Sequence, residues 1–410
     1  MTDAKKILVI NQYYAPDVAS SGQLLAELCE GLAQHGHAVR VICGQPSYQE
    51  DSEDAPVEEI TSDVKVRRVN LGGLKGRTRL SNRIWGYIRF LWLALITSRR
   101  AIKEERPDLI ITLSNPPLVG IIGVFLSFRY KIPFLYVLYD IHPDIVIHTN
   151  WIRLPKMVFW IWNEVSKWIL REASRVVVIG QGMKRTIVED KEIAEKKITV
   201  IPVWARPEIS VETYRGENAR MKYGIGQDDL VLLSAGNLGI MHPVEPILSS
   251  AKAMESNELV KFFFVGGGEG LASVREFVEL NNLEHIYFLP YQSEKDFVEI
   301  LLMADICFVM LEDGMEKYAV PSRAYTFMSA GRPLIAIMDE NADIARMIHD
   351  MDCGWHVSDE RDLVSVIECC IEDPQLPVHK GCNSRDGYLN GLSKSQVISE
   401  YDALIRSMTD

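Results

Sequence analysis

The sequence lacks the marks of several common protein classes. Its seven cysteines are scattered and form no CxxC pair, so neither a disulfide framework nor a zinc site is indicated, and we expect a reducing compartment. No stretch reaches the ~20 consecutive apolar residues that a transmembrane helix requires. The apolar run at residues 7–10 is too short for the core of a secretory signal peptide. These absences predict a cytoplasmic protein that is neither secreted nor inserted across a membrane.

An overall excess of positive charge is also missing. The chain has 44 Lys and Arg against 56 Asp and Glu, and its net charge of −12 disfavours a general nucleic-acid binder. The charge is nevertheless unevenly distributed, because residues 50–63 contain seven acidic and no basic side chains, whereas residues 64–103 contain eleven basic and no acidic ones. Such a local positive field is expected to select an anionic partner or surface.

Aromatic side chains gather in and after this basic segment. Residues 84–96 are strongly apolar, and six of the eight tryptophans lie between residues 85 and 168. Amphipathic aromatic side chains beside Arg and Lys favour the headgroup layer of a membrane. The alternative is ordinary packing of these helices on a sheet, with solvated arginines. The candidate membrane or acceptor contacts are Arg77, Arg79, Arg83, Trp85, Arg89, Trp92, Arg99 and Arg100.

Short apolar segments alternate with helical patterns along the whole chain. Strands are expected at residues 7–11, 38–43, 109–113, 134–138, 175–179 and 198–201, with a helix at 20–34. After the proline-containing segment 202–207, further strands are expected at 230–235, 262–266, 286–289, 304–310 and 333–337. Apolar strands separated by helices indicate parallel sheets covered on both faces. A chain of 410 residues is long enough for two domains of about 200 residues each.

Five motifs occur in an order that resembles one known family. They are Tyr-Tyr-Ala-Pro at 13–16 with Ser-Ser-Gly at 20–22, Asp-Ile-His-Pro-Asp at 140–144, Gly-Asn-Leu-Gly at 236–239, Val-Pro-Ser-Arg at 320–323, and Met-Ser-Ala-Gly-Arg-Pro at 328–333. Over residues 5–345 the chain resembles bacterial GT-B glycosyltransferases of the retaining family 4. The similarity is greatest to the colanic-acid and amino-sugar transferases of surface polysaccharide synthesis.

The resemblance implies an α/β architecture of two Rossmann-like doubly wound domains facing across a cleft. Residues 1–205 would form the acceptor and membrane-contacting domain, and residues 206–385 the nucleotide-sugar donor domain. Residues 386–410, with a helical pattern at 393–408, would cross back to the first domain. The implied reaction is metal-independent transfer from a nucleotide-diphosphate sugar, with UDP as the expected nucleotide and no separate cofactor.

The leaving diphosphate of such a donor must be neutralised, and basic side chains with a helix N-terminus can do this. A helix beginning near Pro321, with Ser322 as its cap, would place Arg323 in its first turn. Arg323 would bind the diphosphate bidentately; the alternative is an ion pair with an acid such as Glu316. The resemblance implies that the donor is bound by Ser21, Gly22, Gly236, Asn237, His242, Gly267, Glu316, Pro321, Ser322, Arg323 and Thr326. For Ser21, an ordinary helix cap is the alternative.

The sequence departs from the family pattern at four positions. Where the family has Arg and Lys after the glycine that matches Gly236, this chain has Asn237 and His242. The two glutamates of the family correspond here to Tyr318 and Thr326, although Glu316 would substitute for the first through a shifted loop. A hydroxyl does not accept two hydrogen bonds from a ribose as a carboxylate does. These departures keep open a non-catalytic, glycosyltransferase-like subunit.

Three polar residues follow the buried strand expected at 134–138. Asp140, His142 and Asp144 are the candidate catalytic residues, with capping and turn roles as the alternative. The resemblance implies that His142 contacts the donor sugar. Asp140 or Asp144 would orient or deprotonate the acceptor hydroxyl if it lies within hydrogen-bond reach.

Two hypotheses follow for the function. The first is a glycosyltransferase, peripheral on the inner face of the plasma membrane, that adds a sugar to a polyprenyl-diphosphate-linked acceptor held by segments 64–103 and 151–170. The second is a non-catalytic subunit that binds lipid or a partner enzyme through the same surface, with a nucleotide-sugar epimerase as a distant third. Partners would be the donor, the lipid-linked acceptor and an anionic membrane, without nucleic acid; the oligomeric state is open.

Overall fold

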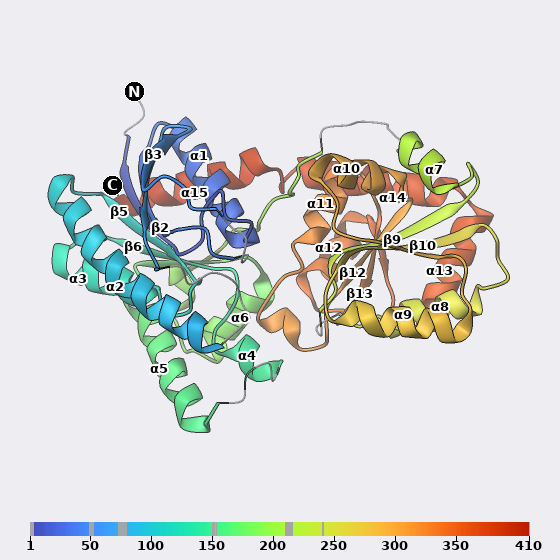
Figure 1. Ribbon diagram of the computed structural model, residues 1–410, viewed down its shortest axis with the longest axis horizontal. Helices are drawn as coiled ribbons and strands as arrows, with labels where there is room; N and C mark the ends of the chain where they lie inside the picture. Colours follow the sequence, from blue (N-terminus) through green and yellow to red (C-terminus); the bar gives the residue numbers. More distant parts are fainter. Residues whose placement is uncertain are drawn as a thin grey trace. The chain divides into compact units, whose positions relative to one another are not determined.

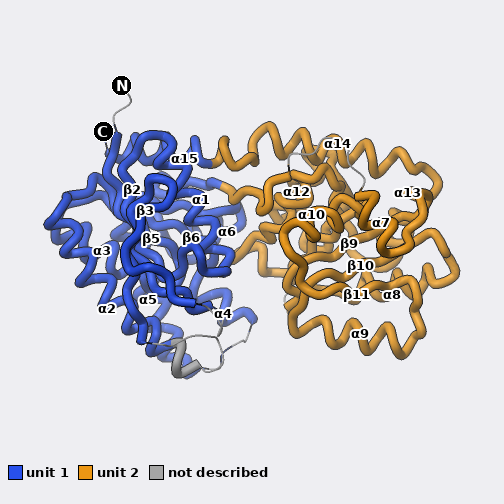
Figure 2. Tube along the Cα trace, turned by 45° about the horizontal axis from the view of Figure 1, so that its top comes forward, with its two compact units in different colours: residues 1–201, 398–410 blue, residues 202–397 orange. Residues whose placement is uncertain are grey.

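The computed structural model describes residues 4–48, 53–72, 80–149, 152, 154–209, 216–239 and 242–409, although nothing is described of the side chains of residues 80–83. The chain forms two compact units (Figure 2). The first contains residues 1–201 and 398–410, and the second contains residues 202–397. The chain therefore returns to the first unit at Ile398. Residue 386, where the sequence analysis began its C-terminal segment, lies inside a helix of the second unit.

The first unit is built on an eight-stranded sheet. Its strands are β1 (Lys6–Ile10), β2 (Ala38–Gly44), β3 (Glu58–Thr61), β4 (Val64–Val69), β5 (Leu109–Leu113), β6 (Phe134–Leu138), β7 (Arg175–Val178) and β8 (Ile198–Val200). Their order is β3-β4-β2-β1-β5-β6-β7-β8, and β3 alone runs antiparallel to its neighbour. The strands β1, β5 and β6 are buried almost throughout because helices cover both faces.

Two groups of helices enclose this sheet. Helices α1 (Ser20–Gln34) and α15 (Lys394–Thr409) lie on one face, and α2 (Leu80–Glu104), α3 (Gly120–Tyr130) and α5 (Lys156–Glu172) lie on the other (Figure 1). Short helices α4 (Asp144–His148) and α6 (Gln181–Glu189) follow β6 and β7. A side chain at Gly31 would lie 2.5 Å from Ile398 Cδ1, so the absence of a Cβ there lets α1 and α15 pack closely.

The hairpin β3–β4 was not expected from the sequence. It pairs the acidic segment with the start of the basic one, so that Glu58 lies opposite Arg67 in the register. Arg67 Nε lies 3.3 Å from Glu58 Oε1, and Arg68 Nη2 lies 2.6 Å from Glu59 Oε1. Part of the positive field predicted for residues 64–103 is therefore compensated inside the fold.

The second unit contains a six-stranded, fully parallel sheet. Its strands are β9 (Leu230–Asn237), β10 (Val260–Gly267), β11 (Ile286–Leu289), β12 (Ile306–Met310), β13 (Leu334–Ile337) and β14 (Gly354–His356), in the order β11-β10-β9-β12-β13-β14. Its helices are α7 (Glu217–Tyr223), α8 (Glu245–Ala253), α9 (Gly270–Asn281), α10 (Glu294–Met303), α11 (Arg323–Ser329), α12 (Asp343–Met351), α13 (Glu360–Glu372) and α14 (Gln375–Leu389).

The predicted fold class is confirmed: both units are α/β layers around doubly wound sheets. Every strand expected from the sequence is present, with ends that differ by at most two residues. The additional strands β3, β4 and β14 are short or charged, and they lack the continuous apolar run that identified the others.

Candidate active site

Glycines shape the carboxyl edge of the second sheet. Gly236, Gly266 and Gly268 have φ of +113°, +123° and +122°, values that side chains rarely allow. A Cβ on Gly266 would lie 2.3 Å from the carbonyl oxygen of Gly236, and one on Gly268 would lie 2.2 Å from that of Leu238. Only glycine therefore lets the ends of β9 and β10 approach each other in this way. In parallel α/β sheets this edge is where ligands bind.

Arg323 lies at this edge as the first residue of α11. Its Nη2 donates a hydrogen bond to the carbonyl oxygen of Asn237 at 2.9 Å, and the Cβ that Gly236 lacks would lie 3.3 Å from the guanidinium carbon. Burial lowers the pKa of Arg323 to about 10, so the group stays charged at neutral pH. Among the described residues no ion pair joins it to a carboxylate, and the alternative pairing with Glu316 is not found.

His242 completes this cluster. Its Nε2 lies 3.3 Å from Arg323 Nη2, and its Nδ1 lies 3.0 Å from the amide nitrogen and 3.3 Å from the oxygen of Gly239. Burial, and then the charge of Arg323, lower the pKa of His242 to about 4. The imidazole is therefore neutral at pH 7. In the tautomer protonated on Nδ1, Nε2 accepts from Arg323 and Nδ1 donates to the Gly239 oxygen, whereas in the other tautomer Nδ1 accepts from the Gly239 amide nitrogen.

Asn237 and Gly267 of the predicted donor site lie beside this cluster, and Glu316 follows β12, the strand next to β9. Asn237 ends β9, and its Oδ1 lies 3.5 Å from the hydroxyl of the exposed Tyr291. A Cβ on Gly267 would lie 2.9 Å from the Tyr291 ring. Glu316 follows β12 in a short 3-10 turn, and its Oε2 is buried with no hydrogen-bond partner in the described part of the chain. Sequence reasoning missed Tyr291, which carries no motif of its own.

Two neighbours of Arg323 have roles that differ from the expected ones. Pro321 and Ser322 precede α11, but the Ser322 side chain makes no capping hydrogen bond. The hydroxyl of Thr326 accepts from the amide nitrogen of Arg206 at 3.1 Å and lies 3.2 Å from its oxygen. Thr326 is buried and fastens the segment after β8 to α11, so its hydroxyl is already engaged within the protein.

In the first unit, Ser21 and Gly22 lie in the first turn of α1. The residue preceding the helix is Ala19, and no side chain caps it, so the capping role considered for Ser21 is not found. Ser21 Oγ instead lies 3.5 Å from Asn115 Nδ2. A Cβ on Gly22 would lie 2.9 Å from the backbone carbon of Tyr13, so this glycine lets the loop after β1 pack on the helix.

The residues after β6 form a second polar cluster. Burial raises the pKa of Asp140 and lowers that of His142, which favours the neutral form of each. The His142 ring stacks on Trp162 of α5 with centroids 5.9 Å apart, and its Nδ1 is buried without a partner among the described residues. Perturbed titration of this kind, close to a strand end, is typical of a functional site.

Asp144 is separated from this cluster by its hydrogen bonds. Both of its carboxylate oxygens accept from Lys191 Nζ, at 2.7 and 2.6 Å, and Lys191 also donates to Asn163 Oδ1 at 2.6 Å. Lys191 is only 2% exposed, so Asp144 compensates a buried positive charge. This geometry favours the structural interpretation of Asp144 over the catalytic one. No pattern in the sequence marks Lys191 as its partner.

The candidate membrane contacts are only partly described. Arg77 and Arg79 lie outside the described residues, and so does the side chain of Arg83. Trp85 and Trp92 are each 66% exposed on α2, and the same helix exposes Arg89, Arg99 and Arg100. The alternative considered above, in which these two tryptophans pack in the core of the protein, is therefore wrong. Within the described part of the chain, no helix combines the length and apolarity needed to span a bilayer.

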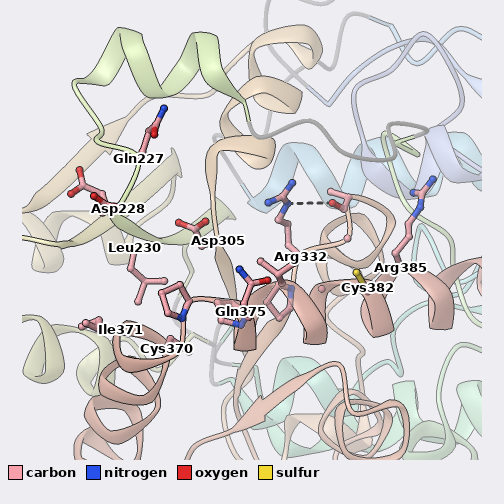
Figure 3. A pocket seen from close by; sticks show the side chains of 18 of the residues that line it. Gln227, Asp228, Leu230, Asp305, Arg332, Cys370, Ile371, Gln375, Cys382 and Arg385 are labelled. Atoms are coloured by element: carbon pink, nitrogen blue, oxygen red, sulfur yellow. Dashed lines mark hydrogen bonds between the residues drawn. The ribbon is translucent and has the colours of Figure 1, made fainter.

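A broad pocket lies at the opposite edge of the second sheet, where β9, β12 and β13 begin (Figure 3). Arg332 donates to the carbonyl oxygens of Ala304 and Ala330, at 2.8 and 3.2 Å. Arg385 donates to two further backbone oxygens, and Asp305 pairs with Arg220 at 2.8 Å. These charged groups stabilise the walls of the pocket. No three or more His, Cys, Asp or Glu side chains of the described residues are grouped to hold a metal ion.

Comparisons with known proteins agree with this architecture. The sequence model of the family described as "Glycosyl transferase 4-like domain" matches residues 21–204, and that described as "Glycosyl transferases group 1" matches residues 216–386. A probable glycosyltransferase, WbjE of Pseudomonas aeruginosa, is 28% identical over 65% of each chain, slightly under two thirds of its length. The putative colanic acid biosynthesis glycosyl transferase WcaI of Escherichia coli is 21% identical over 97% of this chain and 98% of its own.

Solved structures share the fold over nearly the whole chain. Sucrose-phosphate synthase of Thermosynechococcus elongatus superposes with a TM-score of 0.74 at 17% identity, covering 98% of this chain and 99% of that one. HepE of Anabaena, solved in complex with UDP-glucose, superposes with a TM-score of 0.70 at 14% identity, covering 98% of this chain and 100% of that one. Because the two family models match in order along most of the chain and the structure has two α/β units like those of its GT-B structural neighbours, the chain belongs to the glycosyltransferases that these models describe, and it has the GT-B fold.

Proposed function

We propose that this protein transfers a sugar from a nucleotide-diphosphate sugar, with UDP as the expected nucleotide, to an acceptor in bacterial surface polysaccharide synthesis. The observation that carries the proposal is Arg323. A partly exposed guanidinium at the carboxyl edge of the sheet, held by a backbone oxygen and a neutral imidazole and without a carboxylate partner among the described residues, keeps its full charge for an anion. The complex of HepE with UDP-glucose supports UDP for a protein of this fold.

In the proposed reaction, the bond between the anomeric carbon and the diphosphate oxygen breaks as positive charge develops on the sugar. Arg323 would neutralise the leaving diphosphate through bidentate hydrogen bonds, without a metal ion. Neutral His242 would hold the guanidinium in place without adding a competing charge. The buried, unpartnered Oε2 of Glu316 is suited to accept a hydrogen bond from a donor hydroxyl. Retention of anomeric configuration is part of the proposal, as the resemblance to family 4 implies.

On the acceptor side, we assign the positioning of the hydroxyl to Asp140 and His142. Burial raises the pKa of Asp140, which brings its basicity closer to that needed for general-base assistance at neutral pH. His142, neutral because burial lowers its pKa, is suited to hydrogen bonding with a sugar hydroxyl. Asp144 has no catalytic role in this proposal because Lys191 occupies both of its oxygens.

The acceptor is proposed to be a polyprenyl-diphosphate-linked saccharide, reached from the inner face of the plasma membrane. The exposed Trp85 and Trp92 on α2, beside the exposed Arg89, are suited to the headgroup layer of an anionic bilayer. The two tryptophans and Ile88 follow a helical spacing and share one exposed stripe of α2, whereas Phe90 and Ala94 are fully buried.

One observation favours the non-catalytic alternative. The hydroxyl of Thr326 is engaged by Arg206, so the position at which the family has its second glutamate offers no carboxylate for a ribose. A subunit that binds lipid or a partner enzyme without turning over a donor would tolerate this change.

Thermal unfolding of the full chain with UDP, GDP, dTDP, CDP and ADP in turn tests the proposal. A nucleotide at 100 times its dissociation constant stabilises the protein by ~2.7 kcal/mol, which raises the melting temperature by several degrees. We expect stabilisation by UDP, and its loss in Arg323→Met. The matched control is Arg385→Met, which removes an arginine at the opposite edge of the same sheet. If none of the five nucleotides raises the melting temperature, the result would support the non-catalytic subunit.

If UDP binds, the next experiment measures the transfer of sugar from UDP-sugars to a lipid-linked acceptor in buffer that contains EDTA. Nuclear magnetic resonance of the new glycosidic bond then reports its anomeric configuration. An inverted product, or activity that disappears with EDTA and returns with a divalent cation, would contradict the proposed retention or metal independence.

A further inference from the structure

Helix α5 has two chemically different faces. Met157, Trp160, Ile161 and Trp168 are 67%, 63%, 47% and 42% exposed. Their spacing of three, four and seven residues places them on one stripe of the helix. The ends of α5 carry the exposed basic residues Lys156 and Arg171, of which Arg171 lies 3.8 Å from Glu192 Oε2 and is followed by the exposed Glu172. An apolar stripe with tryptophans, flanked by basic side chains, is suited to lie in the plane of an anionic membrane surface.

The opposite face of α5 holds the loop that contains the predicted catalytic residues. Trp162 stacks on His142 with an interplanar angle of 16°. Ser166 Oγ donates to the carbonyl oxygen of His142 at 2.9 Å. One turn away, Asn163 accepts from Lys191, which in turn binds Asp144. The inner face therefore contacts His142 directly and is linked to Asp144 through Lys191.

The two ends of α5 are anchored to different degrees. Near its C-terminal end, Ile169 and Leu170 are 1% exposed. A Cβ on Gly120 of α3 would lie 2.5 Å from Ile169 Cγ2, so the two helices are in close contact there. Near the N-terminal end, the first four residues of α5 include Met157 and Val158, both of which are exposed. The turn that carries Trp162 thus lies between a firmly packed end and an exposed one.

Two buried polar atoms at the contact with the loop are unsatisfied. His142 Nδ1 and Trp162 Nε1 have no hydrogen-bond partner among the described residues, although both side chains line the same small cavity with Asp140 and Ser166. Unpaired buried polar atoms are costly, so a small shift of this turn that lets them pair would be favourable. The contact between His142 and Trp162 would therefore gain stability in a second arrangement, in which these two nitrogen atoms are hydrogen-bonded.

We propose that an anionic bilayer binding to the outer stripe of α5 orders residues 140–144 through Trp162, Asn163 and Ser166, so that acceptor positioning is coupled to membrane contact. This inference rests on the proposed membrane association. Because the coupling is reciprocal, an ordered loop also strengthens binding to the membrane. The bilayer, rather than a second copy of the chain, is the chosen occupant because the stripe combines interfacial tryptophans with flanking positive charge.

Hydrogen exchange of the full chain measured by mass spectrometry tests the coupling. The probe is vesicles of 70% phosphatidylcholine and 30% phosphatidylglycerol, and the peptides of interest cover residues 139–149 and α5. Vesicles should slow exchange in both peptides, by about tenfold for the loop, a typical coupling strength. Trp160→Ser combined with Ile161→Ser should weaken co-sedimentation with vesicles, because the exposed stripe of α2 remains, and should abolish the protection of both peptides. Ser166→Ala and Trp162→Leu should retain co-sedimentation and protection of α5 but lose most of the protection at 139–149.

Each other outcome overturns a defined part of the proposal. Vesicle binding that protects α5 while exchange at 139–149 stays unchanged in the wild-type protein overturns the coupling and leaves membrane association standing. Absence of co-sedimentation overturns the membrane association itself. Protection of α5 that rises with protein concentration in the absence of lipid would show that a second copy is the occupant of the stripe, which refutes the assignment to a bilayer.

Discussion

Protonation of His242 is expected to destabilise the second unit in a defined range of pH. The imidazole lies against the Arg323 guanidinium, and burial and that charge lower its pKa from 6.5 to about 4. A change of about 2.5 pH units corresponds to about 3 kcal/mol, at 1.36 kcal/mol per unit. Because the unfolded chain takes up this proton at a higher pH than the folded one, the contribution is complete above pH 6.5 and is lost as pH falls through 4.

The assay combines a direct titration with a measurement of stability. Two-dimensional nuclear magnetic resonance of the imidazole nitrogens between pH 8 and pH 4 gives the pKa, with His242→Gln identifying the signal. Glutamine is uncharged and keeps an acceptor for Arg323, so it is a matched control. The difference in the free energy of unfolding in urea between wild type and His242→Gln should change by about 3 kcal/mol from pH 7 to pH 4.

A second variant separates the two causes of the shift. Arg323→Met should raise the pKa of His242 only part of the way toward 6.5, because burial is the larger cause and the arginine charge the second. A wild-type pKa near 6.5, or parallel stability curves for wild type and His242→Gln, would refute the contact between a neutral imidazole and a charged guanidinium. The proposed diphosphate site would then lose its geometric basis.

Three further predictions concern the two polar clusters. Gly236→Ala should weaken UDP binding at least about tenfold, measured by titration calorimetry, because φ of +113° disfavours a side chain and the new Cβ would lie 3.3 Å from Arg323; unchanged affinity would contradict this. Asp140→Asn should raise the melting temperature at pH 7 and abolish sugar transfer, because burial raises the pKa of Asp140 and penalises its ionised form; retained transfer would exclude a role for its carboxylate. Asp144→Asn should lower stability by about 3–5 kcal/mol in urea unfolding, because it leaves Lys191 buried without its counter-charge; a neutral effect would refute the ion pair.

Much of the donor cluster was accessible from the sequence because the family resemblance implied that Gly236, Asn237 and Arg323 share one site. Glycines after strand ends agreed with that site, and the structure joins the three residues by hydrogen bonding and close packing. The neutral state of His242 also depends on its burial, which no motif reports.

The sequence by itself determined most of the strands and helices and the two-domain division, because apolar periodicity and glycine after a strand are local properties of the chain. It indicated the family through the resemblance of five motifs that occur in order along the chain. Only the tertiary structure decided which charged side chains remain free of ion pairs and available to bind a ligand. Arg67 and Arg68 are paired with glutamates across a hairpin, and Asp144 with a lysine 47 residues away. Ion pairs between distant segments leave no pattern in the sequence, because their formation depends on how the chain folds back on itself.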